Sequence, residues 1–136
     1  MASDIRFSTT MLNAMLNAID DIIGSGGFLR FFDGTKPATA DVAITTQAQL
    51  AQCALTADSF GDAASRVITA AAISTDTSAD ATGTATWASL VTSAGVRVVD
   101  LTVGEAADSA DITVDNKDFQ AGADIAVTSL TLALAL

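Results

Sequence analysis

Aspartates are the residues of this chain whose side chains are best suited to chemistry, and one short run of them has the spacing of cation ligands. In the run from Asp76 to Asp80, hard oxygen ligands alternate along the chain, as they do in calcium-binding loops. The run lacks the central glycine and the later glutamate of an EF-hand, and it lies between two predicted strands rather than two helices. An ordinary turn built from aspartate and serine is therefore the favoured interpretation, and a calcium site is the alternative.

Glu105, Asp108 and Asp111 form a second acidic loop that is open to the same two interpretations. Its carboxylates would either bind calcium or lie on a solvated rim. The paired carboxylates of Asp20 and Asp21 fall on the predicted outer face of a helix and indicate solvated charge. We assign no metal-binding residue and no cofactor-binding residue from this spacing.

The sequence contains no histidine and one cysteine, which excludes the commonest catalytic and metal sites. Without histidine there is no Ser-His-Asp or Cys-His nucleophile and no ordinary zinc site. Cys53 lies in an apolar run, which favours a buried structural thiol over a reactive one. The glycine-rich run 24–27 follows a helix and precedes a strand, the reverse of a phosphate-binding loop. We predict that the protein is not an enzyme, has no catalytic residue and needs no cofactor.

Trp87 is the only tryptophan, and it stands next to threonine and alanine in a predicted strand. A lone tryptophan on a strand usually packs in the core, which is the favoured interpretation. The alternative is an exposed aromatic platform of the kind found in carbohydrate-binding β-sandwiches.

One helix must precede these residues, because the clearest helical periodicity in the chain covers residues 9–23. A hydroxyl among residues 8–10 can cap its start, and Gly24 is suited to end it. Apolar side chains recur along one stripe at the 3.6-residue spacing. The stripe indicates either a core face or an arm that docks on a partner subunit, with the core face favoured. For the arm, the candidate interface residues are Met11, Leu12, Met15, Leu16 and Ile19.

Short strands separated by turn residues follow the helix and predict a mainly β fold. They are expected at residues 28–32, 49–56, 67–73, 84–91, 96–103, 112–114 and 124–134. About seven short strands at this spacing favour an antiparallel β-sandwich or barrel over a βαβ fold. The last strand ends in apolar residues up to Leu136, which we expect to be tucked into the core, or otherwise to contact a neighbouring subunit.

The length of the chain limits the number of domains, and its net charge limits the kinds of partner. The 136 residues fit one domain over 1–136, with a helix at about 9–23 and a β domain at about 28–136. The formal net charge of −10 disfavours nucleic acid as a partner. No apolar run is long enough for a membrane span, so no membrane partner is expected. The N-terminus lacks the basic-then-apolar pattern of a signal peptide, which indicates synthesis in the cytosol.

Three stretches of the sequence resemble small structural proteins of tailed bacteriophages. The first is a Ser-Thr-Thr sequence at the start of the predicted helix, which the run from Gly27 to Pro37 follows. The second is the run from Asp76 to Trp87, which a glycine hairpin and a strand ending at Gly104 follow. The third is the closing strand at 126–134. Together these turn and packing motifs cover most of the chain.

The resemblance implies a non-enzymatic virion structural protein, and a capsid decoration (cement) protein is the favoured role. Such a protein bridges and stabilises capsomers, so the implied partners are the major capsid protein or other virion proteins. A homo-oligomer is expected, with a trimer favoured. The implied location is the virion, after synthesis in the bacterial host cytoplasm. The alternatives are a tail or head–tail connector structural protein, or a calcium- or carbohydrate-binding β-sandwich module.

Overall fold

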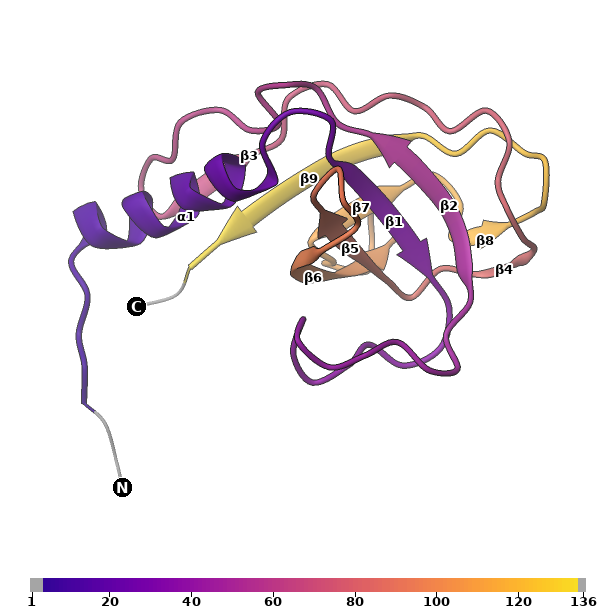
Figure 1. The fold of residues 1–136 in the computed structure, drawn as a ribbon, viewed down its shortest axis with the longest axis horizontal. Coiled ribbons are helices and arrows are strands. Elements are labelled where there is room, and N and C mark those ends of the chain that lie inside the picture. The colour runs from indigo at the N-terminus through magenta and orange to yellow at the C-terminus, as the bar shows by residue number, and fades with distance from the viewer. Residues whose placement is uncertain (1–3, 135–136) are drawn as a thin grey trace.

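The computed structural model describes residues 4–134, in which one helix precedes nine strands (Figure 1). In chain order the elements are α1 (Thr9–Ile23), β1 (Phe28–Phe32), β2 (Gln49–Ala54), β3 (Val67–Thr69), β4 (Gly83–Thr84), β5 (Trp87–Val91), β6 (Arg97–Gly104), β7 (Ile112–Val114), β8 (Asp118–Phe119) and β9 (Val127–Ala133). The mainly β fold with one N-terminal helix is confirmed. The apolar C-terminus up to Leu136, which was predicted to be tucked into the core, extends beyond the described residues.

Both ends of α1 follow from local chemistry. The Ser8 hydroxyl accepts a hydrogen bond from the Met11 backbone N–H at 3.2 Å, which satisfies one of the free donors of the first turn. Gly24 ends the helix at a φ of +64°, a left-handed conformation that glycine adopts without a steric penalty. At Gly27 a Cβ atom would lie 2.8 Å from the Val91 carbonyl oxygen, so only glycine lets the chain turn there from α1 into β1.

Seven strands form one sheet in the order β2-β1-β5-β6-β7-β9-β3. All neighbours in it are antiparallel except β6 and β7, which are parallel and pair only at Val103–Ile112 and Gly104–Thr113. The predicted antiparallel arrangement therefore holds at every other step, and this one parallel pair makes the sheet mixed. A connection of only seven residues, 105–111, suffices because two residue pairs make up the whole parallel contact.

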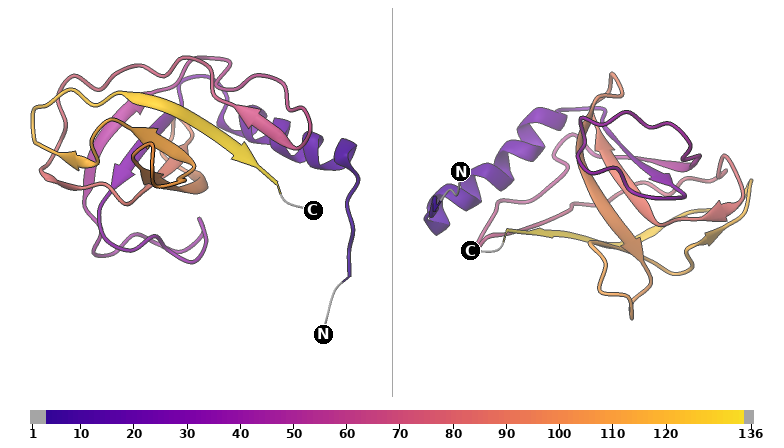
Figure 2. Two further views of the ribbon diagram at one scale, coloured as in Figure 1. Left: turned by 180° about the vertical axis from the view of Figure 1, so that it is seen from behind. Right: turned by 90° about the horizontal axis from the view of Figure 1, so that it is seen from below.

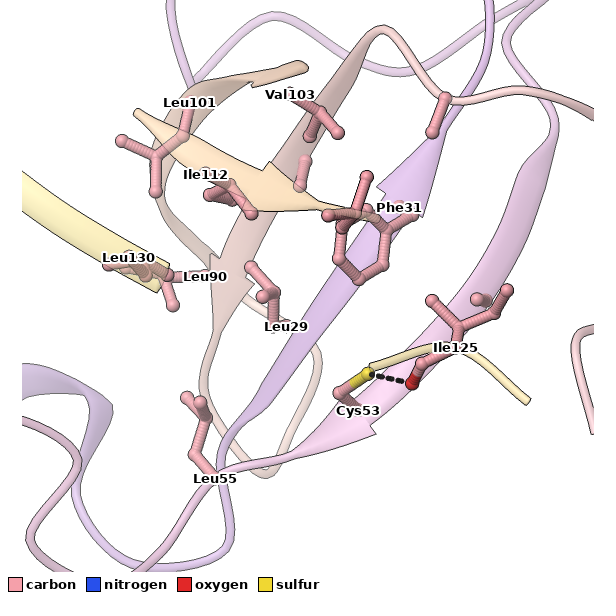
Figure 3. Packing of buried hydrophobic residues seen from close by; sticks show 14 of the residues in the cluster. Leu29, Phe31, Cys53, Leu55, Leu90, Leu101, Val103, Ile112, Ile125 and Leu130 are labelled. Atoms are coloured by element: carbon pink, nitrogen blue, oxygen red, sulfur yellow. Dashed lines mark hydrogen bonds between the residues drawn. The ribbon is translucent and has the colours of Figure 1, made fainter. Parts of the chain in front are cut away.

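The sheet folds over on itself around one apolar core and does not close into a barrel, so the structure is sandwich-like. Leu29 and Phe31 of β1 and Leu90 of β5 face Ile112 of β7 and Leu130 of β9 across this core (Figure 3). All five residues of β5 are buried, and the alternation along the strand places Ala88 and Leu90 in this core while Trp87 lies on the other side of the sheet.

Segment 73–81 spans the gap between the edge of β2 and residues 122–125. Its backbone N–H groups bond to Ala54 and Leu50 of β2 on one side. On the other side, Asp76 and Ile125 exchange two backbone hydrogen bonds at 3.0 and 2.7 Å. This irregular segment thus forms hydrogen bonds along the edge of β2, where backbone groups would otherwise be exposed and unpaired.

Two strands were not foreseen, and one predicted strand is interrupted. β4 and β8 form a separate two-stranded sheet with Gly83 opposite Phe119 and Thr84 opposite Asp118. The strand predicted at 84–91 breaks between β4 and β5, because Ala85 bonds to the Lys117 carbonyl and Thr86 to the Phe32 carbonyl. Two-residue strands are too short to leave a periodic pattern in the sequence.

Candidate functional site

The helix α1 lies at one end of the molecule, where it contacts β3 and β6, and its three faces have different surroundings (Figures 1 and 2). The first face is apolar and packs on the chain's own core. Leu12, Leu16 and Ile23 are buried on it, and Ile19 is partly buried against the same core. The spacing i, i+4, i+7 and i+11 puts these four side chains in one row.

The second face is a row of polar side chains that holds the connector 60–66. The Asn13, Asn17 and Asp20 side chains accept hydrogen bonds from the backbone N–H groups of Arg66, Ala63 and Phe60 at 2.8, 2.8 and 3.1 Å. The expectation that Asp20 is merely solvated is therefore wrong. Three consecutive turns of α1 thus fix an irregular connector whose Ser65 and Arg66 have left-handed backbone angles.

The third face is apolar and exposed. Met11, Met15 and Ile22 are 47, 40 and 60% exposed, and Ala18 lies between them half-buried. We call Met11, Met15, Ala18 and Ile22 the solvent stripe. Its spacing repeats that of the core row one residue earlier, so α1 carries an apolar surface about twice as wide as its own core covers. Phe7, just before the helix, adds a fourth large exposed apolar side chain.

The structure divides the five predicted interface residues between these faces. Leu12 and Leu16 are 4 and 1% exposed and pack within the chain, so they cannot meet a partner. Ile19 is half-buried. Met11 and Met15 are available, and the missed Ile22 joins them. Extending the spacing of Met11 and Met15 by seven residues would have found Ile22 in the sequence.

The run from Asp76 to Asp80 is a bonded turn in this structure. One carboxylate oxygen of Asp76 accepts from the Gln52 N–H at 2.9 Å and the other from the Ser78 N–H at 3.0 Å. Asp80 accepts from the Gln49 side chain at 2.9 Å. Backbone and amide donors thus already bond to both carboxylate oxygens of Asp76 and to one of Asp80, which would be the ligands of a calcium ion.

In the second acidic loop, a lysine side chain already supplies a positive charge to one of the carboxylates. The ammonium group of Lys117 lies 3.1 Å from the Asp108 carboxylate, which also accepts from the Glu105 N–H at 2.9 Å. The Glu105 N–H and the Lys117 ammonium lower the pKa of Asp108, and Asp108 in turn raises the pKa of Lys117. Asp111 is engaged separately, since its carboxylate accepts from the N–H and hydroxyl of Thr102. Across residues 4–134, no group of three His, Cys, Asp or Glu side chains is placed to hold a metal ion.

Trp87 is fully buried on the side of the sheet away from the main core, so its ring offers no open platform. It stacks on Phe32 with ring centroids 4.5 Å apart, and its indole N–H donates to the Asp33 carbonyl at 3.0 Å. The guanidinium carbon of Arg97 lies 5.5 Å from the ring centroid. Arg97 also forms a buried ion pair with Asp100.

Residues 33–48 cross over this tryptophan, and Arg97 fastens them. Its guanidinium donates to the carbonyl oxygens of Thr39 and Val42, in the middle of the segment. At the far end, the Asp33 carboxylate accepts from the Ala48 N–H. These bonds hold an irregular segment in place over the buried ring.

Cys53 is buried in the main core, as its apolar neighbours in the sequence predicted. Its thiol donates to the Ile125 carbonyl oxygen at 3.6 Å (Figure 3). Burial raises the pKa of this thiol, which disfavours the nucleophilic thiolate. The residue therefore contributes packing.

No protein-family model, curated protein or solved structure matches this chain. Among the described residues, no helix has the length and apolar content needed to cross a membrane. The candidate site therefore rests on its own geometry, and the exposed face of α1 is the surface with the strongest physical case for binding.

Proposed function

We propose that this protein is a non-enzymatic structural subunit of a phage virion, in the role of a capsid decoration protein. The observation that carries the proposal is the solvent stripe of α1, in which Met11, Met15 and Ile22 face water on a helix at one end of the molecule. Exposing large apolar side chains in a row has a cost in water, and burial against a neighbouring subunit recovers about 25 cal/mol per Å².

The rest of the molecule supports a role in assembly. The acidic runs around Asp76 and Asp108 are occupied by internal donors, and the Cys53 thiol and the Trp87 ring are buried. The resemblance of the runs from Gly27 to Pro37 and from Asp76 to Trp87 to phage structural proteins agrees with this role. In it, the β domain is a rigid body and α1 is the docking element that bridges neighbouring subunits in the particle.

Binding at many equivalent positions allows each contact to be weak. A subunit that holds two neighbours at once gains effective affinity without any new contact, because the second attachment is intramolecular. A small helix face is therefore sufficient when the particle repeats it many times.

The test is cosedimentation with particles of the encoding phage that lack this protein. The wild type is expected to sediment with them, and Met15→Glu is expected to remain in solution because it places a charge in the solvent stripe. Val96→Glu is the matched control, since Val96 is an exposed apolar residue in the turn between β5 and β6. The proposal fails if the wild type neither binds such particles nor is found in complete virions. Labelling of bound protein then separates a capsid position from a tail or connector position.

A further inference from the structure

We infer that the partner on the solvent stripe is a second copy of this chain, paired antiparallel along α1 about a two-fold axis. The inference rests on the proposed function, because it names the neighbour that the docking face meets. It replaces the trimer that the family resemblance implies with a two-fold pair.

Charge at the two ends of α1 is the first argument. The first turn of α1 contains no acidic residue and the last turn contains no basic residue. Instead, Asp20 and Asp21 lie near the C-terminal end, where the helix dipole disfavours negative charge. In a full-length antiparallel pair each copy's exposed Asp21 lies beside the first turn of the other helix, where the free N–H groups favour an anion. In the pair, the Asp21 carboxylate of each copy therefore lies beside the positive end of the other helix dipole. In a single copy, Asp21 lies only beside the negative end of its own helix.

Side-chain size along the stripe is the second argument. When the solvent stripes of two copies, from Met11 to Ile22, overlap completely in the antiparallel direction, residue n lies opposite residue 33 − n of the other copy. Met15 then lies opposite Ala18, and Met11 opposite Ile22. A large side chain meets a small one on each side of the axis, which lets two helices approach to about 8–10 Å. The flexible methionines can fill the remaining irregular space.

The size of the stripe sets the expected strength. One face of a 15-residue helix is smaller than the ~800 Å² that each partner buries in a standard stable interface. The pair is therefore expected to be weak in free solution and to form reversibly in the micromolar range. On a particle the paired copies attach at two points, so that pairing and attachment reinforce each other.

The register makes a sharp cross-linking prediction. In this antiparallel pair, Ala18 lies about 5 Å along the axis from the same residue of its partner, whereas Ile22 lies about 16 Å from its own copy, at 1.5 Å rise per residue. Ala18→Cys is therefore expected to form a disulfide-linked dimer. Ile22→Cys alone is not, but a mixture of Ile22→Cys and Met11→Cys is. The native thiol of Cys53 is buried and does not take part.

Sedimentation equilibrium of the full chain provides the second measurement. Met15→Glu is expected to raise the dimer dissociation constant roughly tenfold or more, as loss of a central interface residue does. Val96→Glu is expected to leave it unchanged. A circular dichroism spectrum and melt identical to the wild type's would show that both variants fold.

The outcomes separate this inference from the proposed function. Self-cross-linking of Ile22→Cys would overturn the proposed pair, because its register keeps the two copies of that residue about 16 Å apart along the axis. A chain that stays monomeric at high concentration, yet binds particles through Met15, would overturn the pairing and leave the virion role standing. A dimer with the predicted cross-links that binds no particle would uphold the pairing while the virion role fails.

Discussion

The carboxylate of Asp76 accepts a hydrogen bond from the backbone N–H of Gln52 at 2.9 Å, so a side chain serves as the pairing partner of the edge strand β2. The other carboxylate oxygen accepts from Ser78, and the Asp76 backbone pairs in both directions with Ile125. One residue therefore ties β2 to the 122–125 segment, through its side chain on one side and its backbone on the other.

Replacing Asp76 with asparagine is expected to destabilise the fold. The amide keeps one acceptor oxygen where the carboxylate has two, so either the Gln52 or the Ser78 N–H loses its partner. The free energy of unfolding, measured by urea denaturation, is expected to fall by about 1.5–3 kcal/mol. The control is Asp80→Asn, at an exposed carboxylate bonded to the Gln49 side chain, where a change within about 0.5 kcal/mol is expected. Equal losses in both variants would contradict this account.

Calcium is expected to leave the melting temperature unchanged. Both oxygens of Asp76 already accept backbone hydrogen bonds, and the Lys117 ammonium group already neutralises Asp108. Differential scanning fluorimetry in excess calcium and in EDTA measures this directly. A melting temperature that rises in calcium would revive a cation site in one of the acidic loops.

The buried ion pair between Arg97 and Asp100 is expected to be far more sensitive than the exposed pair between Arg6 and Asp4. The side chains of Arg97 and Asp100 are 12 and 4% exposed, against 86 and 83% for Arg6 and Asp4. Asp100→Ala leaves a buried guanidinium without a counter-charge and is expected to cost about 3–5 kcal/mol. Asp4→Ala is expected to cost no more than about 1 kcal/mol. Chemical denaturation of both variants measures the two losses of unfolding free energy. Similar losses would show that Arg97 is not held by Asp100.

The polar row on α1 is expected to control hydrogen exchange in the connector 60–66. Asn17→Ala removes the acceptor of the Ala63 N–H, so that amide should exchange several-fold faster, equivalent to about 1 kcal/mol of local protection. The neighbouring amides of Phe60 and Arg66 keep their own acceptors and should change less. Asp21→Ala, at an exposed position of the same helix, is the control. Unchanged exchange at Ala63 in Asn17→Ala would rule out this anchoring role.

The pair of Lys117 and Asp108 makes a prediction about pH. Because the pKa of Asp108 is lowered in the folded state, its contribution to stability is present above an unfolded pKa of about 3.9 and is lost as the pH falls through the lower folded value. Lys117→Met should raise the Asp108 pKa part of the way back, since the Glu105 N–H remains. An NMR titration of the carboxyl carbon measures the shift, with Lys36→Met as the control. A pKa that does not move would mean that Lys117 has little influence on Asp108.

The helix and the main strands could be predicted because their signals are local. Thr9–Ile23 matches the predicted 9–23, since the apolar period, the Ser8 cap and Gly24 all lie within one stretch of chain. The seven predicted strands are all present, because alternation and turn residues are also local. What a side chain bonds to is not local: the partners of Asn13 and Asn17 lie 53 and 46 residues away.

The division of the α1 surface could not be predicted for the same reason. Periodicity places Met11 and Leu12 in one apolar band, but only the packing of β3 and β6 decides which half is covered. The position of Trp87 is a similar case. The sequence indicates burial, whereas its place beneath residues 33–48 depends on the Arg97 contacts to Thr39 and Val42.

The two faces of the large sheet each carry a spectroscopic or chemical reporter that needs no engineering. With one tryptophan and no tyrosine in the chain, ultraviolet fluorescence above the phenylalanine band comes from Trp87 alone and senses release of the 33–48 segment. With one cysteine, reaction with a thiol reagent comes from Cys53 alone and senses opening of the main core. Comparing the two signals during denaturation would reveal whether the outer cover detaches before the core opens, in the native chain and without any label.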